Sequence, residues 1–280
     1  MINKVKRFLH YLYISIKRPE MEILPGNLAF FFMMMIIPVL TILGAFVTNI
    51  DIGERTVYDT LMNNLPDNIA NLIISIAGEG SSSISFFVLL IGSLLLASNG
   101  TYSMIVTSNS IYGISNSNYI KNRIKAFVLM IVLVSLFILL LIIPVINNRV
   151  VNFIAKLVDV NVATNIYVVL YKALKFPVIF LLVFIFVKIL YRFSPNKREN
   201  KRTSYGAVFT SLSLMIVTWG YSIYIEYFST YETFYGGVSG LLFLMLWIYI
   251  ISYIFVLGMN LNFAREKLRE EEQKKKITSN

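Results

Sequence analysis

The chain has 280 residues, of which 57% are hydrophobic, and a formal net charge of +10 from 25 Lys and Arg against 15 Asp and Glu. A soluble core of this composition would leave too little polar surface to stay in solution, so a soluble globular protein is excluded. The chain has no cysteine, which excludes disulfides and thiolate chemistry.

The first predicted element is an amphipathic helix near the N-terminus. Its apolar residues recur at helical spacing among lysines and arginines: Val5, Phe8, Leu9, Leu12 and Ile16. This pattern is typical of a helix that lies in the headgroup region of a membrane. We therefore assign residues 1–27 to a cytoplasmic amphipathic segment.

Six long apolar runs follow, and each is long enough to cross a hydrocarbon core of roughly 30 Å as a helix. The predicted spans are 28–50, 84–107, 126–146, 173–191, 205–227 and 238–261. The sequence thus predicts an all-α integral membrane protein with a six-helix transmembrane domain over 28–263 and a charged cytoplasmic tail over 264–280. Apolar faces at 69–76 and 150–158 predict two further surface helices.

The distribution of basic residues predicts the orientation. Twenty of the 25 Lys and Arg lie in the N-terminal segment, at the second and fourth loops, or in the tail, and the other five are Arg55, Arg149, Lys156, Lys172 and Lys175. Because cytoplasmic loops retain basic residues, both termini are predicted to be cytoplasmic. We interpret the positive charge as topology and contact with anionic lipid headgroups, not as a nucleic-acid surface.

Polar residues inside the spans are the candidate functional site, because such groups are costly in lipid. They are Glu226, Lys175, Asn99, Asn109, Tyr231 and Tyr235. For the lysine, snorkelling to the interface is the simpler interpretation, and for the asparagines it is hydrogen bonding between helices. A pair between Glu226 and Lys175 is a hypothesis based on their similar predicted depth. Gly236 and Gly240 have the spacing of a helix-packing motif.

Signatures of soluble enzymes are missing from the sequence. It has no P-loop and no dinucleotide-binding fingerprint, which argues against bound nucleotide. The single histidine, His10, lies in the basic N-terminal helix without clustered acids, so we predict a surface residue there and no metal site. We expect no catalytic residues, no cofactor and no enzymatic activity.

Several motifs in order along the chain resemble those of one family. They are Gly26–Phe32 with Ile37–Leu40, Asn109–Gly113, Leu190–Asn196, Gly206–Ala207, Tyr231–Gly237, Leu246–Tyr249 and Gly258–Asn262. Together they resemble the YihY/BrkB family of bacterial inner-membrane proteins, formerly labelled ribonuclease BN. The resemblance implies a six-helix fold and a multi-pass location in the bacterial inner membrane. A ribonuclease is disfavoured, because no cytoplasmic segment carries the clustered carboxylates or acid–base pair that phosphodiester hydrolysis needs.

Two functions remain open at this stage. The first is a nucleotide-independent transporter or lipid translocator for an amphipathic or anionic substrate. This function is favoured because the chain combines polar groups in the spans with basic inner surfaces. The alternative is a non-transporting scaffold for envelope proteins, which would bind partners through the Gly236 and Gly240 face and the tail. Membrane lipids are the predicted partners in both cases, and a homo-oligomer is left open.

Overall fold

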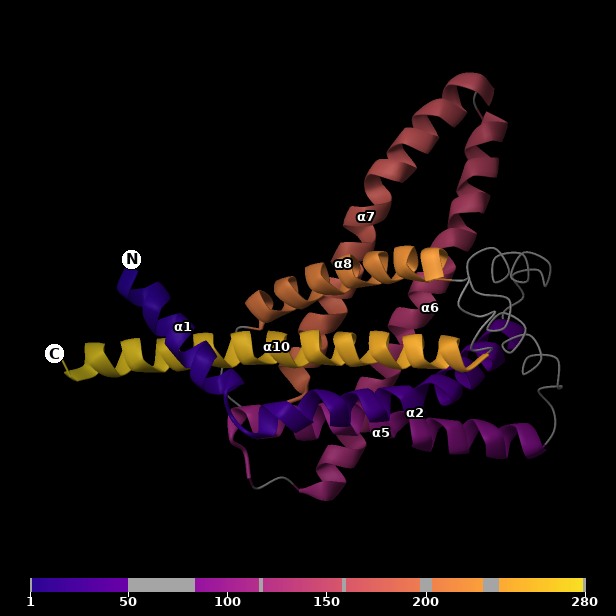
Figure 1. Ribbon diagram of the computed structural model, residues 1–280. Helices are drawn as coiled ribbons and strands as arrows, with labels where there is room; N and C mark the ends of the chain where they lie inside the picture. Colours follow the sequence, from indigo (N-terminus) through magenta and orange to yellow (C-terminus); the bar gives the residue numbers. More distant parts are fainter. Residues whose placement is uncertain are drawn as a thin grey trace. The chain divides into compact units, whose positions relative to one another are not determined.

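The computed structural model describes residues 2–49, 84–115, 118–157, 160–196, 203–228 and 237–278 (Figure 1). Within these ranges the secondary structure consists of helices, without strands. The helices are α1 (Ile2–Ile16), α2 (Glu20–Asn49), α5 (Ile84–Tyr112), α6 (Tyr119–Leu157), α7 (Val160–Phe193), α8 (Ser204–Phe228) and α10 (Gly237–Thr278). Side chains are described in 5–39, 91–139, 176–196, 203–224 and 242–277, apart from residues 20, 37, 116, 117, 137 and 276. The predicted all-α class is confirmed for this part of the chain.

Each of the six predicted spans falls in a helix of its own, from α2 to α10. Among the described residues, three helices are long and apolar enough to cross a membrane: Phe176–Phe193, Ser204–Tyr224 and a stretch within Leu242–Lys275. A shorter apolar helix covers Met21–Ile36. Each apolar run that predicted a span is therefore helical over its described residues.

Several helices are longer than the spans they contain: α5 continues to Tyr112, and α7 begins at Val160. α10 continues past residue 261 to Thr278, and α6 continues to Leu157. The separate surface helix predicted at 150–158 is thus wrong as far as Leu157, because no glycine or proline after Pro144 interrupts α6. The other predicted surface helix, at 69–76, lies outside the described residues.

The chain forms two compact units. Unit 1 comprises Met1–Met33, Asn99–Leu129 and Val183–Asn280, and unit 2 comprises Met34–Ser98 and Met130–Leu182. Of the 25 Lys and Arg, five, three and twelve lie in the three segments of unit 1, and the remaining five lie in unit 2. Unit 1 thus contains the 20 basic residues that the predicted orientation places on the cytoplasmic side, and unit 2 contains the other five.

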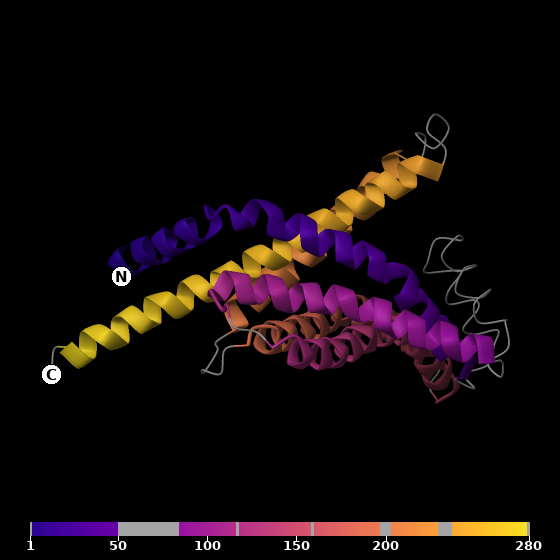
Figure 2. The ribbon, with the colours of Figure 1, turned by 90° about the horizontal axis from the view of Figure 1, so that it is seen from below.

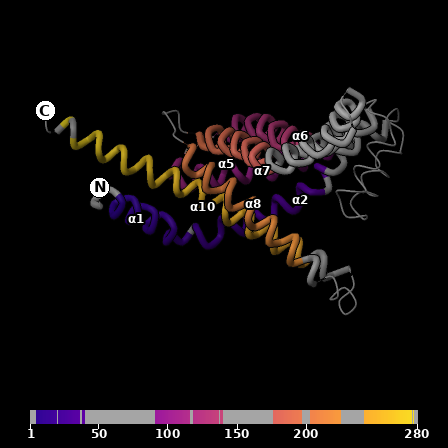
Figure 3. The backbone as a smooth tube through the Cα atoms, turned by 90° about the horizontal axis from the view of Figure 1, so that it is seen from above, coloured from indigo at the N-terminus to yellow at the C-terminus, as the bar shows by residue number. Residues whose placement is uncertain are grey.

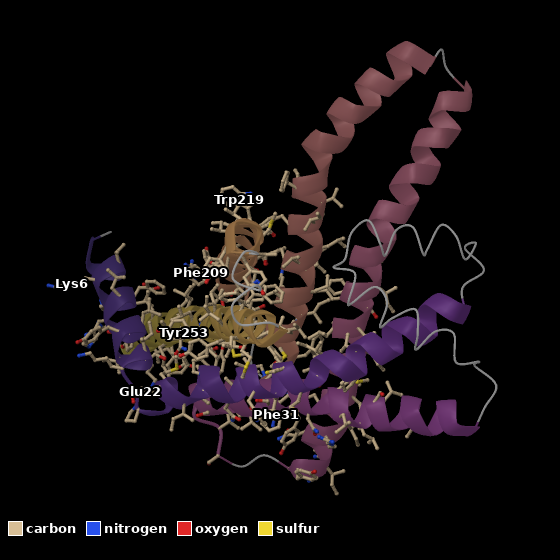
Figure 4. The ribbon with its side chains drawn as sticks, turned by 45° about the vertical axis from the view of Figure 1, so that its right-hand side comes forward. Lys6, Glu22, Phe31, Phe209, Trp219 and Tyr253 are labelled. Atoms are coloured by element: carbon tan, nitrogen blue, oxygen red, sulfur yellow. The ribbon has the colours of Figure 1, made fainter. Side chains whose placement is uncertain are left out.

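In unit 1, α8 and α10 pack as an antiparallel pair (Figure 3). Toward the C-terminal end of α8, Tyr221 stacks on Trp247 with ring centroids 5.2 Å apart, and Tyr224 meets Phe243 edge-on at 5.1 Å. Trp219 is 66% exposed on the same helix (Figure 4). Such exposed aromatic side chains suit contact with lipid.

The helix α1 packs obliquely across the C-terminal part of α10 (Figures 1 and 2). This confirms the predicted N-terminal helix and shows that it packs on protein as well. The largest fully buried apolar side chains of unit 1 come from α2, α5, α6 and α10: Leu28, Met104, Ile105, Leu129, Val256 and Met259. Segments far apart in the sequence thus share one core.

Unit 2 is described in less detail. Its buried apolar side chains include Met35, Val39, Ala97, Met130 and Val134. They come from α2, α5 and α6, so these helices bury apolar surface in this unit too.

Candidate functional site: two polar junctions in unit 1

The first junction is centred on Tyr191, near the end of α7. Its buried hydroxyl donates a hydrogen bond to the carbonyl oxygen of Phe255 in α10, at 2.8 Å. It also lies 2.6 Å from the hydroxyl oxygen of Thr210 in α8, and since the tyrosine proton is engaged by Phe255, Thr210 is the donor in this second bond. One phenol oxygen therefore joins three helices.

Two glycines allow α8 and α10 to approach closely beside this hydroxyl. A Cβ atom added to Gly206 would lie closer than 3.0 Å to the backbone oxygen of Gly258 and to the side chain of Asn262. A Cβ atom added to Gly258 would collide with the hydroxyls of Thr210 and Tyr191. Hydrogen atoms at both positions are thus what lets the two backbones meet. We call Tyr191, Thr210, Gly206, Gly258 and Asn262 the Tyr191 junction.

Asn262 supports the first turn of α8 from another helix. The first backbone N–H groups of a helix have no partner within it. Here the amide of Gly206 donates to Oδ1 of Asn262, at 2.8 Å. The Nδ2 atom of Asn262 is buried and has no hydrogen-bond partner among the described residues.

The second junction is centred on Asn196, just after α7. Its backbone N–H donates to Oδ1 of Asn109 at 2.9 Å, and its Nδ2 donates to Oδ1 of Asn122 at 2.7 Å. The ammonium of Lys125 donates to Oδ1 of Asn196 and to the carbonyl oxygen of Ser194, both at 2.7 Å. These five residues, the Asn196 junction, join the end of α7 to α5 and α6.

Local sequence explains why α5 and α6 present these groups together. Gly113 ends α5 in the left-handed region with φ 67°, and the N–H groups of Gly113 and Ile114 bond back to Ser110 and Asn109. This is a Schellman motif, which glycine favours. Asn118 then caps α6, because its Oδ1 accepts from the backbone N–H of Ile120 at 3.0 Å. Local hydrogen bonds therefore fix the end of α5 and the start of α6.

Two further asparagines make contacts between helices in unit 1. Oδ1 of Asn99 in α5 accepts from the guanidinium of Arg123 in α6 at 2.7 Å. Asn260 in α10 accepts from the hydroxyl of Ser15, and its Nδ2 contacts the sulfur of Met21 at 3.2 Å. The asparagine side chains thus bond to other helices at both places.

Electrostatic contacts join α1 to the C-terminal part of α10. Glu271 accepts from the guanidinium of Arg7 at 3.3 Å and from the hydroxyl of Tyr11 at 3.1 Å, and Lys275 lies 2.8 Å away. Burial, and then the bond to Glu271, raise the pKa of Tyr11 above its ordinary value. Hydrogen bonds from Lys275 and Tyr11 lower the pKa of Glu271. We call these four residues the Glu271 cluster.

Several buried polar atoms of unit 1 have no hydrogen-bond partner among the described residues. Besides Asn262 Nδ2, they are the hydroxyls of Ser103, Thr107 and Ser108 in α5, Asn109 Nδ2, Ser211 in α8, and Ser252 and Trp247 Nε1 in α10. An unpartnered buried polar group costs roughly 2–7 kcal/mol in an apolar environment. Each of these atoms therefore has unused capacity for hydrogen bonds.

Of the site residues predicted from sequence, the structure describes two. Asn99 and Asn109 both lie in α5, and each accepts a hydrogen bond, from Arg123 and from the Asn196 backbone respectively. Only the helical backbone is described at three other predicted positions, Lys175 in α7, Glu226 in α8 and Gly240 in α10. Tyr231, Tyr235 and Gly236 lie outside the described residues. The hypothesis of a Glu226–Lys175 pair accordingly stays a prediction. His10 is exposed, as predicted.

Sequence reasoning missed the centres of both junctions. Tyr191, Asn196, Gly206, Gly258 and Asn262 were noted as members of motifs, without a role. The sequence did contain a signal for them. Four of the motifs that carry the family resemblance supply residues of the two junctions: Asn109–Gly113, Leu190–Asn196, Gly206–Ala207 and Gly258–Asn262. Among the described residues, no group of three or more His, Asp or Glu side chains is arranged to hold a metal ion.

The apolar helices and their polar junctions define an all-helical membrane protein. A family model described as virulence factor BrkB matches residues 15–279, and the chain belongs to this family. This confirms the resemblance seen in the sequence.

Curated relatives match a shorter part of the chain. A ribonuclease-like protein, YfkH, of Bacillus subtilis (strain 168) is 34% identical over 85 residues, which is 29% of this chain and 31% of the relative. A UPF0761 membrane protein of Pseudoalteromonas atlantica is 33% identical over 89 residues, 31% of this chain and 30% of the relative. One of Xanthomonas oryzae pv. oryzae is 34% identical over 68 residues, 24% of this chain and 16% of the relative. The matches thus span less than a third of each relative's length, and no solved structure matches the chain.

Proposed function

We propose that this membrane protein is a nucleotide-independent transporter or lipid translocator for an amphipathic or anionic substrate. It would cross the bacterial cytoplasmic membrane six times with both termini inside, and it would have no enzymatic activity. The observation that carries the proposal is the set of buried polar atoms without hydrogen-bond partners in α5, α8 and α10. A substrate that presents oxygen atoms to these groups would supply the missing partners.

The position of these atoms along α10 supports a route rather than a single pocket. Trp247, Ser252 and Asn262 are spread over 15 residues, or roughly 22 Å at the α-helical rise. The hydrocarbon core to be crossed is roughly 30 Å thick. Polar groups thus recur over most of the depth that a substrate must pass.

The chemistry of the atoms supports the substrate class. Asn109 Nδ2, Asn262 Nδ2 and Trp247 Nε1 are donors only, and hydroxyls donate or accept. A ligand rich in acceptor oxygens complements such a set, as do phosphate esters and carboxylates. The Lys125 ammonium in the Asn196 junction adds a positive charge to unit 1, where anionic groups are favoured.

The experiment is flux in proteoliposomes, with an NBD-labelled anionic phospholipid and trapped radiolabelled citrate as separate probes. In Ser211→Ala and Thr107→Val, which remove unpartnered hydroxyls, we expect several-fold lower flux of the probe that the wild-type protein moves. The matched control is Ser222→Ala, since Ser222 is on the same helix as Ser211 but is exposed and donates to the Thr218 carbonyl.

Two results would count against the proposal. Flux of both probes no greater than in protein-free vesicles would reject transport and favour the scaffold alternative. Wild-type flux in Ser211→Ala and Thr107→Val would remove these hydroxyls from the route. Size-exclusion profiles would show that each variant is folded.

A further inference from the structure

The helix α1 packs on unit 1 through a mixed face, on which the apolar residues Phe8, Leu12 and Ile16 are half-buried beside polar ones. Arg7 and Tyr11 bond to Glu271, and Ser15 bonds to Asn260, all in α10. Positions 7, 11 and 15 are four residues apart and so share one face of the helix. The covered face of α1 therefore combines charged and hydroxyl groups with half-buried apolar side chains.

One row of apolar side chains on α1 is left uncovered by the described residues. Val5 is 54% exposed, Leu9 54% and Tyr13 57%. These positions are again four residues apart, on a face turned well away from the docked one. We call Val5, Leu9 and Tyr13 the apolar face of α1.

Cationic side chains border this face. Lys6 and Lys17 are both exposed, and they lie about 20° apart on one edge of the apolar face at 100° per residue. Lys6 extends away from the other helices (Figure 4). The ammonium of Lys17 lies 4.9 Å from the centre of the Tyr13 ring. Apolar residues with lysines at their edge fit acyl chains below and anionic headgroups above.

The position of α1 along the chain favours a lipid surface over a second copy of the protein. Only residues 17–19 separate α1 from α2, which begins the apolar stretch Met21–Ile36. A symmetric contact through the apolar face would also bring the lysines of two copies together, at a cost in charge repulsion.

We propose that α1 binds the anionic lipid surface of the cytoplasmic leaflet through Val5, Leu9 and Tyr13, with Lys6 and Lys17 at the headgroups. Its opposite face holds the C-terminal extension of α10 through the Glu271 cluster. The extension is thereby attached to the membrane surface at a point beyond its own span. This inference concerns the surface of unit 1 and is independent of any transport route.

Spin-label depth measurements test the proposal, and a chain without cysteine makes each labelled variant unique. Leu9→Cys, Tyr13→Cys and His10→Cys would be labelled in full-length protein reconstituted in phosphatidylcholine vesicles with and without phosphatidylglycerol. The readout is the accessibility of the nitroxide to oxygen, which enriches in lipid, relative to a water-soluble nickel complex. His10 is the matched control, because it is exposed and adjacent to Leu9 but points to another side of α1.

In anionic vesicles we expect labels at positions 9 and 13 to favour oxygen several-fold over nickel, and the label at 10 to favour nickel. The double variant Lys6→Gln and Lys17→Gln should reduce the oxygen preference at position 9 in anionic vesicles and leave neutral vesicles unchanged. Nickel accessibility at 9 and 13 equal to that at 10 would overturn the proposal. Equal oxygen preference of the labels in both vesicle types would overturn the role of anionic headgroups. Dipolar broadening of the position 9 label that grows with protein density would assign the apolar face of α1 to a second copy of the protein.

Discussion

Substituting Gly206 by alanine tests the close approach of α8 and α10 most directly. The new Cβ atom would lie closer than 3.0 Å to the backbone oxygen of Gly258, which cannot rotate away, and to Asn262. Overpacking costs about 1–3 kcal/mol. Displacing Asn262 would also leave the Gly206 amide without its partner, at about 1–3 kcal/mol. Alanine's better helix propensity returns about 1 kcal/mol, so we expect a net loss of about 1–5 kcal/mol.

The assay is equilibrium unfolding of the purified protein in mixed micelles, followed by circular dichroism as the SDS fraction rises. Gly220→Ala is the matched control: it lies in the same helix and a Cβ atom there meets no atom within 4 Å. We expect this control to be neutral or slightly stabilised. If Gly206→Ala unfolds at the same SDS fraction as Gly220→Ala, the two backbones are not in contact as described.

A double-mutant cycle extends the test to Gly258. The collision in Gly258→Ala is chiefly with two hydroxyls, those of Thr210 and Tyr191. Removing one of them in Gly258→Ala with Tyr191→Phe should relieve part of the strain. The combined loss should thus be smaller than the sum of the single losses, and simple additivity would contradict this geometry.

Three further predictions follow from the junctions and from the Glu271 cluster. Tyr191→Phe removes two hydrogen bonds in an apolar span and should cost about 1–3 kcal/mol in the same unfolding assay, at about 0.6–1.7 kcal/mol for each bond; no loss would contradict the role of the hydroxyl. Lys125→Met should speed hydrogen exchange at the backbone amides of Ser194 and Asn196, because the Ser194 carbonyl and the Asn196 side chain lose the ammonium, and an unchanged rate would refute this. Folding lowers the pKa of Glu271, so its contacts should be complete above the ordinary Glu pKa of about 4.3. They should weaken as the pH falls through the lowered pKa of the folded protein. A spin-label distance between positions 6 and 273 that stays constant down to pH 2 would contradict this.

The helices were predictable because each depends on residues that are neighbours in the sequence. Twenty apolar residues in a row indicate a span wherever the rest of the chain lies. Asn99 and Asn109 were also found, because an amide within an apolar run is conspicuous by itself. By contrast, the end of α6 was misjudged, since an apolar face looks the same in a separate surface helix and in the last turns of a longer one.

The junctions were not predictable, because they depend on pairs of residues from different helices. The sequence rule for close packing looks for two small residues four apart in one helix, and it selected Gly236 and Gly240. The contact that the structure describes uses one glycine from each of two helices, Gly206 and Gly258, which are 52 positions apart. No spacing within a single sequence identifies such a pair. Likewise, the bonds of Asn196 are visible only once α5 and α6 stand beside the end of α7.

The hydrogen bond from Gly206 to Asn262 has a consequence for the biogenesis of the protein. The ribosome completes α8 before it has made Asn262, which lies near the middle of the last helix, so the first turn of α8 enters the membrane without this partner. That amide must rely on water or lipid headgroups until α10 is inserted. The final helix therefore supplies a hydrogen-bond acceptor to the start of α8, and a chain interrupted before residue 262 would lack it.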